Sequence, residues 1–345
     1  MDFISYFLEK VEHQKIVSII GLAKNVSKTT TLNYLISNLK DFRLGLTSIG
    51  RDGEKYDVIT ELPKPRIFVK KDTIIATAQN SFEAAEIKME LLKTTGINTP
   101  LGEILILKAL EEGLIELAGP SINKNLLVVC SELKKLGCDL ILIDGAFDRR
   151  SYATPLISDA TILSTGASVS ENMQDVIDIT THAINLFNIE VEKDSTILKI
   201  AKDIFQSAKV GIINKNNSKN LIEISTSLDS ASDIIEHLDN DSKYLVINGA
   251  VTDKLLEDIM RLTEKFKDVI TLVEDATKLF LSKSVIMKFQ KKGGSLKVVN
   301  PINIIAVTIN PTSPYGYKFN KDNFLRLLRE KIDTPIYDLG GDNEN

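Results

Sequence analysis

The sequence contains few residues of the kinds that build disulfide-linked or metal-bound proteins. Of its 345 residues only two are cysteine, Cys130 and Cys138, and three are histidine. Two cysteines are too few for a disulfide framework, and both lie among apolar residues, so we expect buried, reduced thiols rather than redox or metal-binding groups. The histidines, His13, His182 and His237, are far apart in the sequence and show no metal-ligand spacing.

The sequence also lacks a long apolar run and a strong excess of one charge. No apolar stretch approaches the roughly 18 residues that span a bilayer. Asp2, Glu9 and Glu12 interrupt the first segment, and no small-residue cleavage site follows, which argues against a signal peptide. The formal net charge is -5, with acids and bases mixed along the chain and no evident basic face. We therefore expect a cytoplasmic protein without a membrane or nucleic-acid partner.

What is present is the composition of an ordinary globular protein, with 43% hydrophobic and 26% charged residues. The length suggests roughly two domains. The charged segment 190–203 marks the expected boundary, which gives a first domain at 1–190 and a smaller α/β domain at 191–345. The sequence contains no internal repeat.

Strands and helices alternate along both parts of the chain. Apolar, β-branched runs predict strands that are covered on both faces, as in a parallel sheet. In the first part we expect strands at 15–20, 44–49, 66–69, 73–78, 114–118, 139–145 and 159–166, and helices at 2–13, 28–39, 122–136 and 169–187. In the second part we expect strands at 209–213, 244–247, 269–273, 302–309 and 335–337, and helices at 230–238, 252–266 and 321–331. This alternation predicts a doubly wound, mainly parallel sheet with a second, smaller α/β domain.

Residues 15–31 are the most informative stretch of the chain. They read as a buried strand ending at Gly21, a tight loop, and a helix that opens on Lys28-Thr-Thr. This is the layout of a phosphate-binding P-loop, although Ser27 stands where the pattern has glycine and the spacing back to Gly21 is one residue too long. The sequence predicts that a nucleotide contacts Lys24, Asn25, Val26, Ser27, Lys28, Thr29 and Thr30. Lys28 would reach the terminal phosphates as a catalytic residue, and the hydroxyl of Thr29 or Thr30 would ligate Mg²⁺.

Two interpretations of this loop compete with that prediction. The helix could simply be capped by Ser27 or Asn25, with Lys28 in solvent. Lys24, four residues before Lys28, could reach across a homodimer interface, as an extra loop lysine does in some dimeric ATPases, although the spacing is one residue shorter than in that pattern. Otherwise Lys24 contacts phosphate from its own loop or is solvated.

Acidic residues follow two of the expected strands. Asp144 ends a buried strand, where it would hold Mg²⁺ directly or through water; the alternative is a turn formed by Asp144 and Gly145. Asp52 lies in the loop after the second strand, where it would hold Mg²⁺ or position an attacking water as a catalytic residue; the alternative is an ordinary polar turn.

Two further loops, one in each expected domain, follow predicted strands. Thr165 and Gly166 end a strand at a place suited to base or ribose contacts. Residues 310–317 form a Pro/Gly turn with two tyrosines after a later strand, and this turn is either a recognition loop or a rigid connection.

Several of these motifs together resemble a known family. Gly21-x-x-Lys-Asn-x-Ser-Lys-Thr-Thr, Ser48-Ile-Gly-Arg-Asp-Gly-Glu, Leu142-Ile-Asp-Gly-Ala-Phe-Asp-Arg, and the segments 94–102 and 310–316 are similar to the P-loop subunit of lysine 5,6-aminomutase reactivase. The first half also resembles, more loosely, dethiobiotin synthetase and other P-loop proteins of that branch. The resemblance covers most of the chain and implies a sheet of P-loop NTPase type.

The resemblance carries functional expectations. It implies ATP and Mg²⁺ as cofactors, and a role in lysine fermentation, where a reactivase would use ATP to exchange damaged cobalamin in the adenosylcobalamin-dependent aminomutase. Lysine 5,6-aminomutase and a MutS-like ATPase subunit would be the partners. Family members carry glycine where this chain has Ser27, which leaves ATP hydrolysis open. The competing hypotheses are a dethiobiotin synthetase-like ligase that activates a carboxylate with ATP, and a degenerate P-loop protein that acts as a scaffold.

Overall fold

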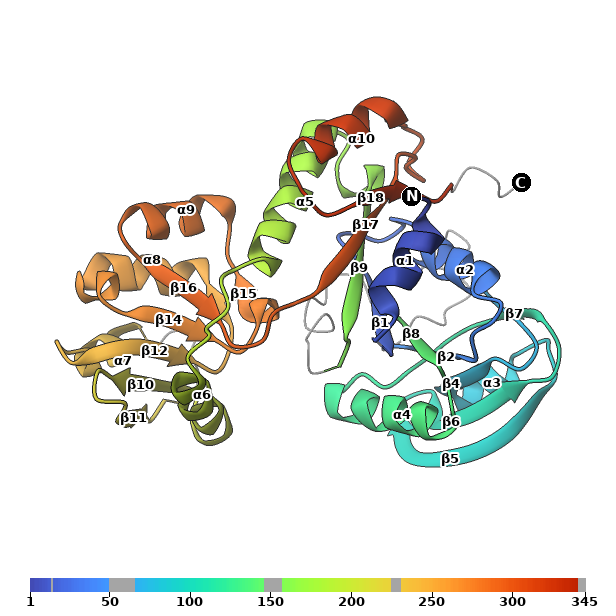
Figure 1. Ribbon diagram of the computed structural model, residues 1–345, viewed down its shortest axis with the longest axis horizontal. Coiled ribbons are helices and arrows are strands. Elements are labelled where there is room, and N and C mark those ends of the chain that lie inside the picture. Colours follow the sequence, from blue (N-terminus) through green and yellow to red (C-terminus); the bar gives the residue numbers. More distant parts are fainter. Residues whose placement is uncertain (14, 50–65, 146–156, 225–230, 341–345) are drawn as a thin grey trace. The chain divides into compact units, whose positions relative to one another are not determined.

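A nine-stranded sheet with β1 (Ile16–Gly21) near its middle dominates the first part of the structure (Figure 1). The computed structural model describes residues 1–13, 15–49, 66–145, 157–224 and 231–340. Within these ranges the strand order is β18-β17-β9-β1-β8-β2-β4-β6-β5. The strands from β18 to β4 run parallel, whereas β6 and β5 run antiparallel to their neighbours. The bounds are β2 Leu44–Ser48, β4 Ile74–Ala78, β5 Met89–Thr99, β6 Gly102–Ala109, β8 Leu140–Asp144, β9 Ala160–Gly166, β17 Ile304–Asn310 and β18 Ile336–Asp338.

Helices cover both faces of this sheet, which explains the continuous apolar runs of its central strands. Val17 and Ile19 of β1 pack in one core cluster with α1 (Phe3–Val11) and α2 (Lys28–Asn38). Ile16 belongs to a second cluster, on the opposite face, with α4 (Asn123–Lys135). Alternate residues of a strand point to opposite faces, so a strand that is apolar at nearly every position is buried from both sides.

The order in which the chain enters the sheet reverses at β1. From β1 the chain passes through α2 to β2, returns through α4 to β8 between these two strands, and then crosses to β9 on the other side of β1. In open α/β sheets, ligands bind outside the carboxyl ends of the strands at such a switch point. The carboxyl end of β1 is where the loop before α2 begins.

Smaller elements complete the first unit. β3 (Ile67–Val69) and β7 (Gly113–Ile115) pair antiparallel, and the 3-10 turn Ala167–Val169 follows β9. The remaining helices are α3 (Gln79–Glu83), α5 (Met173–Phe187) and α10 (Lys321–Arg329). The β5–β6 hairpin and α3 occupy residues for which the sequence predicted no element.

The second unit has its own five-stranded sheet, in the order β11-β10-β12-β14-β16. β12, β14 and β16 run parallel, and β10 and β11 are antiparallel additions. The strands are β10 Val210–Asn214, β11 Lys219–Ile222, β12 Ser242–Ile247, β14 Ile270–Val273 and β16 Ser295–Val298, with a small pair β13 Val251–Thr252 and β15 Leu279–Phe280. The helices are α6 Ser195–Ser207, α7 Ala231–His237, α8 Asp253–Leu262 and α9 Lys283–Lys291, with the short 3-10 helices Lys265–Lys267 and Ala276–Lys278.

The structure confirms the expected fold class, an α/β protein with a large, mainly parallel sheet and a second, smaller α/β unit. The units comprise residues 1–181 with 303–345, and residues 182–302. The expected division at 190 had left all later residues in the second domain. Residues 303–345 instead return to the first unit, because β17 pairs along β9 and β18 pairs with β17.

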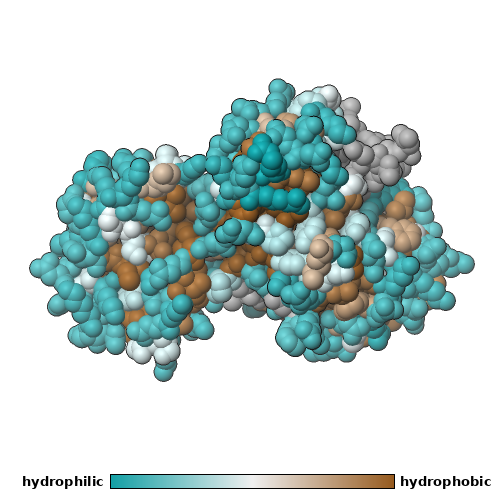
Figure 2. Space-filling view, turned by 45° about the horizontal axis from the view of Figure 1, so that its top comes forward, coloured by the Kyte–Doolittle hydropathy of each residue, from teal (hydrophilic) through white to brown (hydrophobic). Residues whose placement is uncertain are grey.

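The surface agrees with the composition. Hydrophilic residues cover much of the face of each unit seen in Figure 2. Among the residues that the structure describes, no helix combines the length and the apolar character needed to cross a membrane.

Candidate nucleotide site

The loop between β1 and α2 contains two residues in the left-handed backbone region that are not glycine. They are Asn25, with φ 57°, and Ser27, with φ 64°. Left-handed residues in a loop turn successive backbone N–H groups toward one side and create a concave nest for an anion. Asparagine tolerates this conformation, whereas serine adopts it only at a cost of about 1–2 kcal/mol. The glycine-like geometry of a phosphate loop is therefore present at Ser27 without the glycine.

The amino end of α2 has no side-chain cap. Ser27 occupies the N-cap position, but its side chain makes no capping hydrogen bond, and no acidic residue lies in the first turn. Side chains do cap α1, α6, α8, α9 and α10, whereas α3 and α4 also begin without one. The structure thus contradicts the alternative in which the Ser27 side chain caps this helix, and it leaves the positive end of the helix dipole facing the loop.

Backbone N–H groups at this helix end point out of the helix. The first helical hydrogen bond is donated by Thr31 N to Ser27 O at 2.9 Å. The N–H groups of Lys28, Thr29 and Thr30 precede it and therefore have no acceptor four residues back within the helix. Together with the helix dipole, such groups form an anion-binding end.

Lys28 folds back over the loop rather than away from it. A Cβ atom added at Gly21 would lie 3.0 Å from Lys28 Cδ and 2.7 Å from Val26 Cγ2. The Lys28 ammonium lies 3.4 Å from the carbonyl oxygen of Ala23 in the same loop. Gly21 is therefore needed for the close approach of these side chains, although six residues rather than five separate it from Lys28.

The other predicted loop residues divide by burial. Val26 is 1% exposed, so its side chain anchors the loop and only its main chain can meet a ligand. Lys24, Thr29 and Thr30 are half-buried. The side-chain amide nitrogen of Asn25 is buried and has no hydrogen-bond partner among the described residues, so an unsatisfied donor lies in this loop.

Asp144 lies at the carboxyl end of β8, which runs between β1 and β2. It is in register with Ile19 of β1 and with Ser48 of β2. Leu142 packs on the α2 face of the sheet, and Asp144, two residues on, shares that face. Asp144 as a residue is 5% exposed. Its position beside the loop suits the second acid of a magnesium–phosphate site.

Asp52, predicted to hold Mg²⁺ or position water, lies outside the described residues. Within the described ranges no group of three or more His, Cys, Asp or Glu side chains could hold a metal ion. Mg²⁺ at a phosphate loop needs fewer protein ligands, because phosphate oxygens and water supply most of its coordination.

The loops after β9 and β17 contact the nucleotide-loop candidate directly or through one another. The Ser168 hydroxyl donates to the carbonyl oxygen of Asn25 at 3.0 Å. The Tyr317 hydroxyl donates to the carbonyl oxygen of Ala167 at 2.8 Å. A Cβ atom at Gly166 would lie 2.2 Å from the carbonyl oxygen of Asn310, so only glycine fits where the two strand ends approach. Residues 165–168 and 310–317 thus belong to one edge of the same sheet, whereas the sequence-based interpretation had placed 310–317 in the second domain.

Buried hydroxyls beneath the loop were not predicted. Thr31 of α2, Ser164 of β9 and Thr308 of β17 are hydrogen-bonded to one another and are at most 2% exposed. They come from three separate segments of the chain. Both β9 and β17 carry more than one polar residue among their apolar ones, so nothing in the sequence singles out Ser164 and Thr308.

The second unit holds a buried carboxylate with a structural role. Glu192 is 6% exposed and accepts the backbone N–H groups of Lys193 and Asp194 and, at 2.9 Å, the hydroxyl of Tyr244. Burial raises the pKa of Glu192, but these hydrogen bonds and the Lys297 ammonium at 3.5 Å outweigh it and hold the pKa below its usual value.

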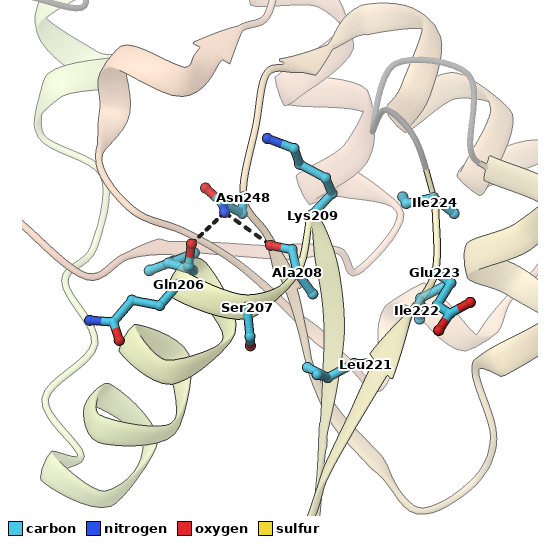
Figure 3. A pocket seen from close by; sticks show the side chains of 10 residues that line it. Gln206, Ser207, Ala208, Lys209, Leu221, Ile222, Glu223, Ile224 and Asn248 are labelled. Atoms are coloured by element: carbon cyan, nitrogen blue, oxygen red, sulfur yellow. Dashed lines mark hydrogen bonds between the residues drawn. The ribbon is translucent and has the colours of Figure 1, made fainter.

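A hollow in the second unit has a polar side chain on its wall that is already hydrogen-bonded within the protein. It lies between the end of α6 and β11 (Figure 3). The Asn248 amide on its wall donates to the carbonyl oxygens of Phe205 and Ala208 at 2.7 and 2.9 Å, which satisfies the end of α6. This amide therefore serves the helix terminus rather than a ligand.

Comparison with known proteins gives little beyond the structure itself. No family model matches the chain, and no curated protein matches its sequence. One solved structure, described as "Structure of pNOB8 ParA bound to nonspecific DNA", matches with 11% sequence identity and a TM-score of 0.26, covering 74% of this chain and 78% of that chain. The fold class therefore rests on the strand order and the loop geometry described above.

Proposed function

We propose that the first unit binds ATP as its Mg²⁺ complex at the loop 21–30. The observation that carries this proposal is the left-handed loop that leads into an uncapped helix, with Lys28 folded across it. Backbone N–H groups, a helix dipole and one ammonium then converge on the same small volume, and this combination suits a polyphosphate.

The residues would divide the work by their chemistry. Lys28 would neutralise the terminal phosphates, while the N–H groups of the loop and the first turn of α2 would hold their oxygens. The Thr29 hydroxyl and the Asp144 carboxylate would ligate Mg²⁺ directly or through water, with Asp52 as the further acid. Bound Mg²⁺ would supply charge neutralisation of the phosphates. The proposal concerns binding, and hydrolysis is measured as a separate property of the same site.

Calorimetric titration with ATP and ADP in the presence of Mg²⁺ tests this site. Lys28→Ala should weaken binding roughly 10- to 100-fold, the effect of losing about 1.5–3 kcal/mol from one charge-assisted hydrogen bond. Lys40→Ala is the matched control, because Lys40 is exposed and follows the opposite end of α2. Equal affinities for wild type and Lys28→Ala would remove Lys28 from the site, and absence of binding to wild type would overturn the proposal in favour of a scaffold.

For the physiological role we propose the P-loop subunit of an ATP-dependent reactivase for lysine 5,6-aminomutase, acting with a MutS-like ATPase subunit in the cytoplasm. The support is the motif resemblance together with a second unit whose buried acids Glu192 and Asp275 both accept hydrogen bonds from neighbouring residues of the chain. Aminomutase inactivated during turnover should regain activity when this chain, the second subunit, ATP, Mg²⁺ and fresh cobalamin are added together. Failure of the chain to bind the aminomutase, alone and with the second subunit, would exclude this role. Phosphate release triggered only by a small carboxylic acid would favour the ligase instead.

A further inference from the structure

A chain of buried hydroxyl groups runs from the sheet to the strained residue of the loop. Ser164 Oγ lies 2.8 Å from Thr308 Oγ1, which lies 3.0 Å from Thr31 Oγ1. Thr31 Oγ1 in turn donates to the carbonyl oxygen of Ser27 at 3.1 Å. All three side chains are at most 2% exposed, so these hydrogen bonds replace solvation that the hydroxyls have lost.

The number of hydroxyl protons determines which group donates in each of these hydrogen bonds. Each hydroxyl has one proton to donate. The Thr31 hydroxyl donates its proton to the Ser27 carbonyl oxygen, so Thr308 must donate to Thr31, and Ser164 must then donate to Thr308. The hydrogen bonds therefore all point the same way, each strengthening the next, and they end on the carbonyl oxygen of Ser27.

The direction of the Ser27 carbonyl group sets the direction of the Lys28 N–H, a donor of the proposed phosphate site. The peptide unit between Ser27 and Lys28 is planar and trans, so the Lys28 N–H points opposite to the Ser27 carbonyl. The Ser27 oxygen accepts two hydrogen bonds, from the backbone and from the side chain of Thr31. Holding this oxygen along α2 therefore aims the Lys28 N–H out of the helix end and into the loop.

The same contacts act on the residue that departs from the glycine pattern. Ser27 has φ 64°, a conformation that serine leaves readily unless neighbouring contacts oppose it. We propose that Ser164, Thr308 and Thr31 are positioning residues that hold Ser27 in its left-handed conformation, and so replace the glycine that a phosphate loop ordinarily uses. This inference rests on the proposed function, because it concerns the nucleotide affinity of that site.

Substitutions at Thr308 and Thr31 separate positioning from simple stability. Thr308→Val and Thr31→Val keep the side-chain shape and remove one hydroxyl, and each should weaken Mg²⁺-ATP binding roughly 3- to 10-fold, the range of a single lost hydrogen bond. Thr308→Ser keeps the hydroxyl and should restore wild-type affinity. Thr47→Val is the control: it removes another fully buried hydroxyl, on β2, two strands away from β1, which donates to the carbonyl oxygen of Ala76 at 3.1 Å, and it should leave affinity unchanged.

The decisive measurement is a double-mutant cycle with Ser27→Gly. Glycine adopts a positive φ without strain, so Thr308→Val should cost less than about twofold in affinity in the Ser27→Gly background. An equal loss in both backgrounds, or an equal loss from Thr47→Val, would overturn the positioning role.

The double-mutant cycle also distinguishes failure of the proposed nucleotide binding from failure of the positioning role. Wild type that fails to bind Mg²⁺-ATP overturns the proposed function alone, because the same four proteins report the coupling through their melting temperatures without nucleotide. Thr308→Val should then lower the melting temperature more in the Ser27 background than with Ser27→Gly. Additive shifts would refute the inference, whatever the nucleotide result.

Discussion

Replacing Ser27 by glycine should stabilise the free protein, an unusual outcome for a change to glycine at a helix start. Ser27 has φ 64°, and its side chain makes no capping hydrogen bond, so the substitution removes strain and loses no cap. The left-handed conformation costs about 1–2 kcal/mol for an L-residue with a Cβ. Glycine gives back about 0.4–1 kcal/mol through the greater entropy of the unfolded chain.

The net gain is therefore about 1 kcal/mol or somewhat less. For a unit of this size such a gain raises the melting temperature by about 2–4 °C. Ser27→Ala is the matched control, because alanine keeps the Cβ and the strain and also loses no cap; its melting temperature should stay close to that of wild type.

Differential scanning calorimetry of the full chain compares the three proteins. A second comparison is Asn217→Gly, at a residue with the same φ of 64° where asparagine already tolerates the conformation, and this change should bring no gain. A melting temperature for Ser27→Gly at or below that of Ser27→Ala would show that the Ser27 backbone is not strained. The argument that Ser27 occupies a position suited to glycine would then fail.

Two further predictions concern buried groups. The pKa of Glu192 is held below its usual value of 4.5, so the stability that the ionised side chain contributes is fully present above pH 4.5 and is lost as the pH falls further. Glu192→Gln should therefore lower the melting temperature at neutral pH. The difference from wild type should shrink below pH 4.5. A constant difference across this range would contradict it. Burial raises the pKa of Cys130 to about 12 and that of Cys138 to about 11, so neither thiol should react with a thiol reagent at pH 8 until urea unfolds the protein. Rapid reaction of the native protein would refute this.

Much of the first sheet could be predicted from local sequence because its strands are buried on both faces. β1, β2, β8 and β9 are short apolar runs bounded by turn residues, and α2 and α4 show helical periodicity between them. β5 escaped prediction because it is largely exposed and lacks such a run, whereas β6 contains a buried apolar run at 104–107 and was missed. In the second unit α6 was interpreted as a charged boundary, although its apolar residues Ile197, Ala201 and Ile204 face the core.

The candidate site was predictable only in part. The spacing of Gly21, Lys28 and Asp144 along the chain pointed to a phosphate loop and a neighbouring acid. The structure places Gly21 and Asp144 at the carboxyl ends of the adjacent strands β1 and β8, and Lys28 at the start of α2. The positions of Thr308 and Ser164 beneath the loop could not be predicted, because the contact between β17 and β9 joins residues 144 positions apart. Pairing over such distances leaves no periodicity in the local sequence.

The sequence by itself determined that this chain forms a mainly parallel α/β sheet, with a loop and a helix directly after its first strand. Strand and helix formation depend on residue type and period, which are local properties. Only the tertiary structure decided that residues 303–345 return to the first sheet, that Ser27 adopts a left-handed backbone, and that Thr31, Ser164 and Thr308 meet beneath it. These features depend on which buried strands become neighbours, and that choice is made by the packing of the whole unit.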